Sequence, residues 1–426
     1  MIYNVRDFGA IGDGLTDDTQ AIQDAMDACS NTDGEVIIPQ GVYQCGTVYL
    51  RSKMTLNIKQ HAVLLGSDVI NDYVETQADF TDAVGQKRGR CLLLGFQVKD
   101  VHVKGEGCIC GRGHGFVPEE DSFPIRPFLV RFIACEDIDI EGITLRDAGA
   151  WCLHLHSSRN ITISHVTIDN HVNRNNDGID IDACSHVLIQ SCYINTGDDA
   201  ICLKTTKDEP CEHIVVKHCV ISSHWSGFKI GTESVGDFRD IQVEDCFFYD
   251  IKGCAIKIVP VDGGHVEGVK IRRINLLRCT GPIFVASGNR LNTYFNEARS
   301  EPGTIKQVII EHVCGDVIEA VGNGTNGLDD AKGCVVISGI LEQPVEDIII
   351  RSCDLSMPGG VKTIREAYQV PEMEDRYPEF GNFGILPAYG FFLRHGKNIT
   401  LENNVIRLKK EDCRLEVVKE DIMEDS

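Results

Sequence analysis

The sequence lacks the features that mark membrane-spanning, nucleic-acid-binding and secreted proteins. No apolar run approaches the roughly 18 residues that span a bilayer, and residues 1–20 contain neither a basic start nor an apolar signal stretch. Lys and Arg number 41 against 64 Asp and Glu, and the formal net charge of −23 disfavours binding to nucleic acid or an anionic membrane. We therefore expect a cytoplasmic protein with no nucleic-acid or membrane partner.

Cysteine is abundant, yet its arrangement does not indicate disulfides or a metal site. The 19 cysteines are an odd number, none forms a Cys-x-x-Cys pair, and most lie inside apolar runs such as residues 188–194 (LIQSCYI). His154 and His156 point the same way along a predicted strand, but no third ligand has a suitable spacing. We expect reduced, buried thiols, no metal and no cofactor.

An eight-residue frame recurs, with apolar residues at its first, third, sixth and usually eighth positions. Two short alternating runs meet at a polar corner in each frame, as in residues 161–168 (ITISHVTI). The frame starts at Ile138, Ile161, Val187, Ile214, Ile241, Val269, Val308, Ile348 and Ile399. Asn-Gly and Asp-Gly turns do not separate these runs, so hairpins of a sandwich fit less well than stacked coils.

The repeat predicts an all-β chain folded as a right-handed parallel β-helix, in a single domain over residues 1–426. Its sixth positions, several of them Cys, would form an interior column. Residues 17–29 predict an amphipathic helix with Asp17 as N-cap and Gln20 at the third position, which would cover the N-terminal end within a cap region of residues 1–50. Residues 407–426 are expected to be a solvated end segment. Long insertions follow in the late coils at 277–307, 316–347 and 356–398.

Carboxylates and lysines occupy similar offsets from the frame starts in successive coils. Asp177, Asp198 and Asp199 come first, and Lys204, Ser226, Lys229 and Lys257 follow on the same predicted stripe. Cleavage of a glycosidic bond needs one protonated and one ionised carboxyl group, and crowded carboxylates can retain a proton at neutral pH. The alternative is that these Asp-Gly and Gly-Asp-Asp stretches are turns at strand ends.

The motifs resemble those of the polygalacturonase-like glycoside hydrolases, family 28. The likeness runs from residues 5–26 through 175–204 to 377–406, and its most specific parts are Asn175-Asn176-Asp177 and Gly197-Asp198-Asp199. The resemblance implies hydrolysis of an α-linked pectic sugar with inversion. It also implies that Asp198 is the general acid and that Asp177 and Asp199 hold and deprotonate the attacking water.

Two motifs depart from the family pattern. Ser226-Gly227 stands where the family has His-Gly, preceded by Trp225 in a manner similar to the rhamnogalacturonan hydrolase branch, and His224 lies two residues away. Ala255-Ile256-Lys257 stands where polygalacturonases have the Arg-Ile-Lys that binds a galacturonate carboxylate. These departures argue against plain homogalacturonan as the substrate.

Several residues are candidate substrate contacts, each with a structural alternative. The lysines could bind a uronate or be ion-paired, Trp151 and His154 could stack on a sugar or pack, and the insertion residues could line a subsite or an ordinary surface. The candidates are Lys257, Lys229, His154, Trp225, Ser226, His224, Arg290 and Tyr294.

We interpret the chain as an exo-acting hydrolase of pectin-derived oligosaccharides that contain galacturonate or rhamnose and galacturonate. Its partner would be a small acidic or deoxy-sugar oligosaccharide. One alternative is a pectate-lyase-like β-eliminase, which would need Ca²⁺ and a basic residue such as Lys229 or Lys257. Another is a non-catalytic carbohydrate-binding β-helix.

Overall fold

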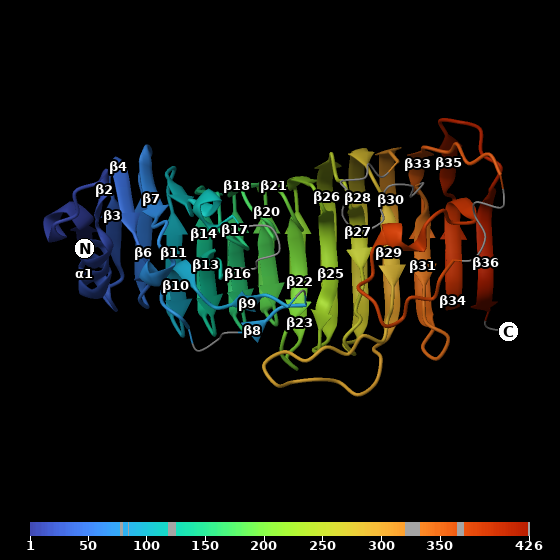
Figure 1. The fold of residues 1–426 in the computed structure, drawn as a ribbon, viewed down its shortest axis with the longest axis horizontal. Coiled ribbons are helices and arrows are strands. Elements are labelled where there is room, and N and C mark those ends of the chain that lie inside the picture. The colour runs from blue at the N-terminus through green and yellow to red at the C-terminus, as the bar shows by residue number, and fades with distance from the viewer. Residues whose placement is uncertain (77–79, 84, 118–124, 320–332, 364–369, 425–426) are drawn as a thin grey trace. The chain divides into compact units, whose positions relative to one another are not determined.

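The computed structural model describes the chain except residues 77–79, 84, 118–124, 320–332, 364–369 and 425–426. It divides into two compact units, Met1–Asp198 and Asp199–Ser426, each of which is described by itself. Figure 1 shows that both units consist mainly of strands. Parts of the second and third predicted insertions lie outside the described residues, and the single-domain organisation stays a prediction.

The N-terminal unit contains three ladders of parallel strands, which are the faces of its coils. The first is β1 (Ile2–Asn4), β3 (Gly34–Ile38), β6 (Met54–Ile58), β11 (Lys99–Lys104), β14 (Glu136–Glu141), β17 (Arg159–Ser164) and β20 (Ser185–Gln190). The second is β2 (Asp13–Asp17), β4 (Gly41–Cys45), β7 (Ala62–Gly66), β12 (Cys108–Cys110), β15 (Thr144–Arg146), β18 (Thr167–Asn170) and β21 (Tyr193–Thr196). The third is β5 (Val48–Tyr49), β10 (Cys91–Phe96), β13 (Phe128–Ile133), β16 (Leu153–His156) and β19 (Ile179–Asp182).

The C-terminal unit continues this pattern with longer strands that turn a corner within one element. Its first two faces are formed by β23 (Cys211–Lys217), β24 (Val220–Ser223), β26 (Phe238–Tyr249), β28 (Val266–Cys279), β30 (Ile305–Val317), β32 (Val345–Arg351), β33 (Asp354–Met357), β34 (Ala388–Glu402), β35 (Val405–Leu408) and β36 (Leu415–Met423). Its third face is formed by β22 (Ile201–Thr205), β25 (Ser226–Ser234), β27 (Cys254–Ile258), β29 (Ile283–Ala286), β31 (Val335–Ser338) and the first parts of β34 and β36.

The register confirms the predicted repeat. In the N-terminal unit Ile138 pairs with Ile161, which pairs with Val187. In the C-terminal unit the frame starts from Ile214 to Ile399 pair in unbroken succession. The sixth frame positions are buried from Ile143 to Cys353, and only the last, Asn404, is half-buried. Each unit therefore consists of stacked coils of the right-handed parallel β-helix that the sequence predicts.

The corners of the coils depend on backbone in the left-handed region. The fifth residue of every frame has a positive φ, from 54° to 55° at His165, Ser191 and His312, for example. The residue before every frame start also has a positive φ, as at Asn160 (56°) and Asn398 (53°). Polar residues and glycine adopt this region most readily, which explains why polar residues separate the apolar runs.

The N-terminal helix confirms the prediction except at its first turn. The helix α1 is Thr19–Cys29, and its residues Ile22, Ala25, Met26 and Cys29 are fully buried. The N-cap is Asp18, not Asp17, and the Asp18 carboxylate accepts hydrogen bonds from the backbone N–H groups of Ile11 (2.7 Å) and Gly12 (3.0 Å) instead of capping the helix. The Asp18 carboxylate therefore binds the preceding loop and does not cap the helix.

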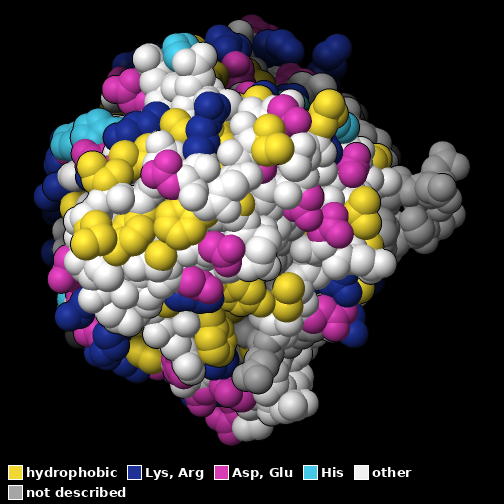
Figure 2. Space-filling model, turned by 90° about the vertical axis from the view of Figure 1, so that its left-hand side faces the viewer, with side chains coloured by type: hydrophobic (Ala, Val, Ile, Leu, Met, Phe, Trp, Pro, Cys, Tyr) yellow, Lys and Arg dark blue, Asp and Glu magenta, His cyan; other side chains and the backbone are white. Residues whose placement is uncertain are grey.

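The two chain ends differ in how they finish the strand ladders. At the N-terminal end, Figure 2 shows hydrophobic side chains interspersed with acidic and basic ones, so no continuous apolar face is left there. At the other end, part of the predicted solvated segment forms β36, which pairs in parallel with β34 from Phe391–Val417 to Lys397–Met423. Among the described residues, no helix is both long and apolar enough to cross a membrane.

Candidate active site

Two carboxylates of the N-terminal unit lie together in the loops that come after the paired strands β18 and β21. Asp177 directly precedes the turn into β19, and Asp198 follows β21. A carboxylate oxygen of Asp177 lies within 4.8 Å of one of Asp198. Asp177 is buried, whereas Asp198 is partly exposed. The pair therefore combines a shielded carboxylate with one that solvent or a ligand can reach.

Buried amides hold the two turns that carry these carboxylates. The Asn170 side chain donates to the backbone oxygen of Asp177 (2.9 Å), and the Asn170 backbone oxygen accepts from the N–H of Gly197 (2.8 Å). The Asn176 side chain donates to the backbone oxygens of Ala148 and Ala150, both at 3.0 Å, while its own backbone oxygen accepts from the N–H of Asp198 (3.2 Å). Asn170 was not among the predicted site residues, although its side-chain amide and its backbone oxygen together connect both turns.

A buried arginine near the pair was also missed from the sequence. The Arg126 guanidinium donates to Asn173 (3.2 Å) and Asn175 (2.8 Å), so it fixes the segment that leads to Asp177. Burial and the neighbouring Arg88 lower the pKa of Arg126 to about 9, against the opposing effect of the carboxylates of Asp82, Asp177 and Asp198. Arg126 comes just after residues 118–124 and outside the repeat frames, so no sequence pattern marked it.

His154 is part of the packed outer face of β16 and does not face solvent. Its side chain is completely buried; Arg131 Nε donates to its Nδ1 (3.1 Å), and its Nε2 lies 3.3 Å from Asp182. Its ring also packs against Phe128 and Trp151, with centroid distances of 5.1 and 5.3 Å. His154 and Trp151 are therefore packed against other side chains, which was the structural alternative. Neither has the exposed surface on which a sugar could stack.

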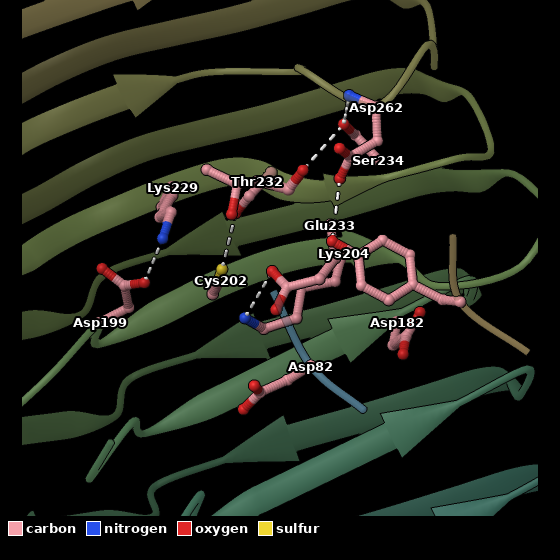
Figure 3. Close-up of polar contacts among 12 residues, drawn as sticks. Asp82, Asp182, Asp199, Cys202, Lys204, Lys229, Thr232, Glu233, Ser234 and Asp262 are labelled. Carbon is pink, nitrogen blue, oxygen red and sulfur yellow. Dashed lines mark hydrogen bonds and ion pairs between the residues drawn. The ribbon is translucent and has the colours of Figure 1, made fainter. Parts of the chain in front are cut away.

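In the C-terminal unit, Asp199 forms a buried ion pair with Lys229. Asp199 Oδ2 lies 2.6 Å from Lys229 Nζ, and Figure 3 shows the two side chains pointing toward one another. Burial alone would raise the pKa of Asp199, but Lys229, Lys257 and Lys204 outweigh burial and lower it. Asp199 is therefore held ionised, as a group that orients water requires.

Lys229 and Lys257 are neighbours in register on β25 and β27, as the stripe predicts. Both are buried, and Lys257 Nζ lies 2.6 Å from Glu379. Lys204 likewise lies 3.2 Å from Glu233, as Figure 3 also shows. In the structure these lysines are ion-paired, which was the structural alternative. Their role as uronate contacts stays a prediction.

Arg290 and Tyr294, from the first long insertion, join one hydrogen-bonded group around Asp262. Arg290 binds Asp262 through two nitrogens (2.9 and 2.5 Å), and the Tyr294 hydroxyl donates to the same carboxylate (3.0 Å). The Asp262 backbone N–H in turn donates to Ser234 Oγ (2.9 Å), a contact visible in Figure 3. Both predicted residues are thus close together, and Tyr294 is buried rather than part of the surface.

The residues at the altered His-Gly motif lie at the start of β25. Ser226 is buried, His224 is exposed and Trp225 is partly buried, with its Nε1 donating to Glu379 Oε1 (3.2 Å). A Cβ at Gly227 would lie 2.8 Å from the Ala255 backbone oxygen. The glycine of this motif is therefore required by packing.

Tyr377 and Glu379 are site residues that the sequence reasoning did not assign. The Tyr377 ring lies over Lys229 Nζ at 5.3 Å and Lys257 Nζ at 5.7 Å, and its hydroxyl accepts from Lys229 (2.9 Å). Both residues fall in the stretch 377–406 that contributes to the family resemblance. The resemblance of that stretch was the available signal. Tyr377 and Glu379 themselves lie outside the repeat frames, so no spacing assigned them a role.

The carboxylates of Asp177 and Asp198 are also close enough together for both to contact one metal ion. Calcium takes six to eight oxygen ligands, so a calcium ion here would need further oxygens besides this pair. The absence of a metal stays a prediction, which the chelator arm of the experiment below tests.

Comparison with known proteins identifies what the chain is similar to. The profile of glycosyl hydrolases family 28 matches residues 29–331. A probable polygalacturonase of Vitis vinifera is 31% identical over 296 residues, which are 63% of this chain and 60% of that protein. The exo-poly-alpha-D-galacturonosidase of Dickeya chrysanthemi is 24% identical over 328 residues, 64% of this chain and 54% of that protein. The chain thus spans between 54% and 60% of the length of these curated relatives.

Solved structures show the same fold. The exopolygalacturonase of Thermotoga maritima superposes with a TM-score of 0.73 at 21% identity, covering 96% of this chain and 92% of that one. The family 28 exopolygalacturonase of Yersinia enterocolitica gives 0.76 at 16% identity, covering 100% and 78%. At these sequence identities the structural comparison supports the β-helix fold and does not assign a substrate or an activity.

Proposed function

Because the chain belongs to family 28 of the glycosyl hydrolases, we propose that it hydrolyses an α-glycosidic bond in an oligosaccharide derived from pectin. The observation that carries this proposal is the carboxylate pair of Asp177 and Asp198, whose oxygens approach within 4.8 Å at two adjoining strand ends. Glycosidic hydrolysis requires two such groups in different protonation states.

In the proposed reaction, Asp198 is the general acid, the role that the resemblance of its Gly-Asp-Asp motif implies, and its partial exposure lets a sugar reach it. It protonates the glycosidic oxygen as the bond to the anomeric carbon breaks. Asp177 and Asp199 orient a water and accept its proton while the water oxygen bonds to the anomeric carbon. The Lys229 ammonium, 2.6 Å from Asp199, supports the ionised form that this role needs.

Inversion of configuration and exo action are further parts of the proposal. Inverting enzymes have carboxyl groups roughly 6.5–9.5 Å apart, a spacing that refers to whole groups, whereas the 4.8 Å limit here refers to the nearest oxygens. Exo action is supported by the name of the relative from Dickeya chrysanthemi, an exo-acting galacturonosidase. The proposed substrate contains galacturonate, or rhamnose and galacturonate.

The test replaces Asp198 by Asn and measures turnover and binding separately. Short galacturonate-only, rhamnose–galacturonate and rhamnose-capped oligosaccharides are incubated with each protein, with and without chelator. Removing a general acid lowers the rate by roughly 10²–10⁴, and we expect this loss for Asp198→Asn with binding retained. The control Asp169→Asn changes an aspartate whose side chain is 62% exposed and should leave turnover unchanged.

The products distinguish the proposal from its alternatives. A chelator-insensitive monosaccharide with inverted anomeric configuration supports exo hydrolysis with inversion. A chelator-sensitive product that absorbs in the ultraviolet would instead show β-elimination. Binding without any product, or an unchanged rate in Asp198→Asn, would refute the proposed reaction.

A further inference from the structure

The outer side of the third face is closed in the N-terminal unit. A strand with one side in solvent alternates between buried and more exposed residues, as β11 and β14 of the first face do. On the third face every residue of β13 and β16 is buried, and in β10 only Phe96, at the end of the strand, is exposed. These strands are therefore covered on both sides, by the core within the coils and by chain outside them.

The cover includes a short antiparallel hairpin that follows β7 in the chain. It consists of β8 (Phe80–Thr81) and β9 (Lys87–Arg88). Phe80 packs against the Trp151 ring with a centroid distance of 6.0 Å, and the Arg88 guanidinium lies over the same ring at 5.3 Å. Trp151, which directly precedes β16, is only 2% exposed as a result. The hairpin thus takes the surface that this tryptophan would otherwise offer to a ligand.

Trp151 occupies the position directly before Asp177 in the stack of coils. Strands β16 and β19 pair in the register of Leu153 with Ile179, so two residues earlier Trp151 is the counterpart of Asp177. The N–H of Cys152 donates to the backbone oxygen of Asp177 (3.1 Å), in agreement with this register. Neighbouring coils are about 4.8 Å apart. The third face is therefore closed a single coil away from one carboxylate of the proposed reaction.

The hairpin is bound to the loop that carries Asp177. Gln86, between the two hairpin strands, donates through Nε2 to Asn175 Oδ1 (2.8 Å). Within the hairpin, Arg88 and Asp82 form an ion pair at 2.8 Å whose side chains are 1% and 2% exposed. Separating such a buried pair would leave two uncompensated charges, which is strongly unfavourable. The hairpin is consequently a fixed wall beside the acidic pair.

A polysaccharide cannot pass from Asp177 across β16. Binding along a β-helix requires open surface for successive sugar residues, and the row next to Asp177 is filled by Trp151 beneath the hairpin. Asp198 is partly exposed, so a sugar can reach the acidic pair itself. A spacing of about 4.8 Å is close to the length of one pyranose ring, so at most one sugar residue fits between the acidic pair and the wall.

We infer that the hairpin of β8 and β9 ends the binding groove one coil before Asp177, so that the protein binds a polysaccharide only by a chain end. The inference rests on the proposed function for the identity of the ligand as a pectic polysaccharide. It deepens that proposal by giving exo action a structural cause in Phe80, Gln86 and Arg88. Its chemical consequence is the release of one sugar residue at a time.

The experiment counts the protein molecules that bind to one polysaccharide chain. Asp198→Asn is saturated onto two size fractions of rhamnogalacturonan whose mean chain lengths differ tenfold, and two fractions of homogalacturonan are treated in the same way. Analytical ultracentrifugation gives the mass of each complex. Binding by a chain end should give one protein per chain at both lengths. A number that rises with chain length would show binding at internal positions and would overturn the inference.

A second variant removes the wall's ion pair. Asp82→Ala and Arg88→Ala are combined on the Asp198→Asn background, so neither buried charge is left without its partner. Loss of the pair and of the Arg88 contact with Trp151 should loosen the hairpin and uncover the row before Asp177. The number of proteins bound to one long chain should then rise at least twofold. An unchanged number would contradict the role of the hairpin.

The matched control is the double variant Asp27→Ala and Arg51→Ala on the same background. This pair has the same separation of 2.8 Å, but its side chains are 49% and 34% exposed. The control should keep one protein per chain. If the hairpin variant does not fold, the counts for Asp198→Asn alone decide. Because the count measures binding, absence of hydrolysis by the wild type would refute the proposed function and leave this result independent.

Discussion

Among single residues, His154 shows how burial changes the chemistry of a side chain. A histidine on a strand that precedes a catalytic motif could serve as acid, base or sugar contact. In the structure burial, reinforced by Arg131, outweighs the hydrogen bond with Asp182 and lowers the pKa of His154 to about 3. Since Arg131 donates to Nδ1, the neutral ring carries its hydrogen on Nε2 and donates to Asp182. His154 is a neutral connector between two charged groups.

This shift predicts a contribution of His154 to the pH dependence of stability. Its ordinary pKa of 6.5 applies in the unfolded chain, so between about pH 3 and 6.5 the unfolded chain binds a proton that the folded one does not. The stabilisation is complete above pH 6.5 and is lost as pH falls through this window, by about 1.4 kcal/mol per pH unit.

The check is chemical denaturation at several values between about pH 4 and pH 6. His154→Gln should lower the slope of the unfolding free energy against pH by about 1.4 kcal/mol per unit. Equal slopes in the wild type and His154→Gln would show that His154 is protonated in the folded protein.

The sequence indicated some site residues and missed others for physical reasons. Asp177 and Asp198 lie in the loops that come after β18 and β21, and because these two strands are paired, stacking brings the two loops together. Glu379 and Lys257 are 122 positions apart (379 − 257), and Glu379 lies in an insertion without periodicity. No rule of strand spacing connects an insertion to a particular coil, so the pair that neutralises Lys257 could be recognised only in three dimensions.

Among elements, the frame of two strands and a corner was the most predictable feature because one residue period determines both burial and pairing. The frame starts pair with each other as expected, from Ile138 to Val187 and from Ile214 to Ile399. The N-cap of α1 was wrong by one residue because Asp17 and Asp18 are chemically equivalent as caps. The loop contacts of Asp18 with Ile11 and Gly12, which distinguish them, are not a local sequence property.

Because Ser191 lies at a corner with left-handed backbone, we expect a β-branched residue there to lower the free energy of unfolding more than glycine does. Its φ is 55° and its side chain is exposed, so a change there acts through the backbone and not through packing. A β-branched residue is especially unfavourable in this region, and Ser191→Val should lower the free energy of unfolding by about 1–2 kcal/mol. Ser191→Gly should cost less than about 0.5 kcal/mol, because glycine accepts this conformation.

Urea denaturation of both variants measures the difference. Thr167→Val places the same residue on the extended strand β18 and should remain near the wild type. If Ser191→Val proves as stable as Thr167→Val, the corner backbone does not impose the restriction described here.

At the scale of the whole molecule, cysteine serves packing. In the described residues no disulfide joins any of the 19 cysteines, and 16 of them (19 − 3) are buried, the exceptions being Cys413, which is exposed, and Cys108 and Cys314, which are partly exposed. Burial raises the pKa of Cys91 and of Cys334 to about 12. The thiolate is the reactive form, so buried thiols are both inaccessible and protonated.

Thiol titration should therefore separate these classes. Without reductant, the denatured chain should release 19 thiol equivalents, whereas the folded protein should show one immediate equivalent from Cys413. Cys413→Ser should abolish that immediate reaction and leave the slower ones. Fewer than 19 equivalents in denaturant would reveal disulfides, and an immediate reaction in Cys413→Ser would show that another thiol is accessible.

The unbroken pairing of frame starts in the C-terminal unit has a consequence for how such a chain can diversify. Val269, Val308, Ile348 and Ile399 stay in register although the intervals between them are 39, 40 and 51 residues. The strands thus tolerate loops of very different length without losing alignment. The loop that carries Tyr377 and Glu379 lies in the longest of these intervals, so its contacts with Lys229 and Lys257 come from a segment whose length does not affect the alignment of the strands.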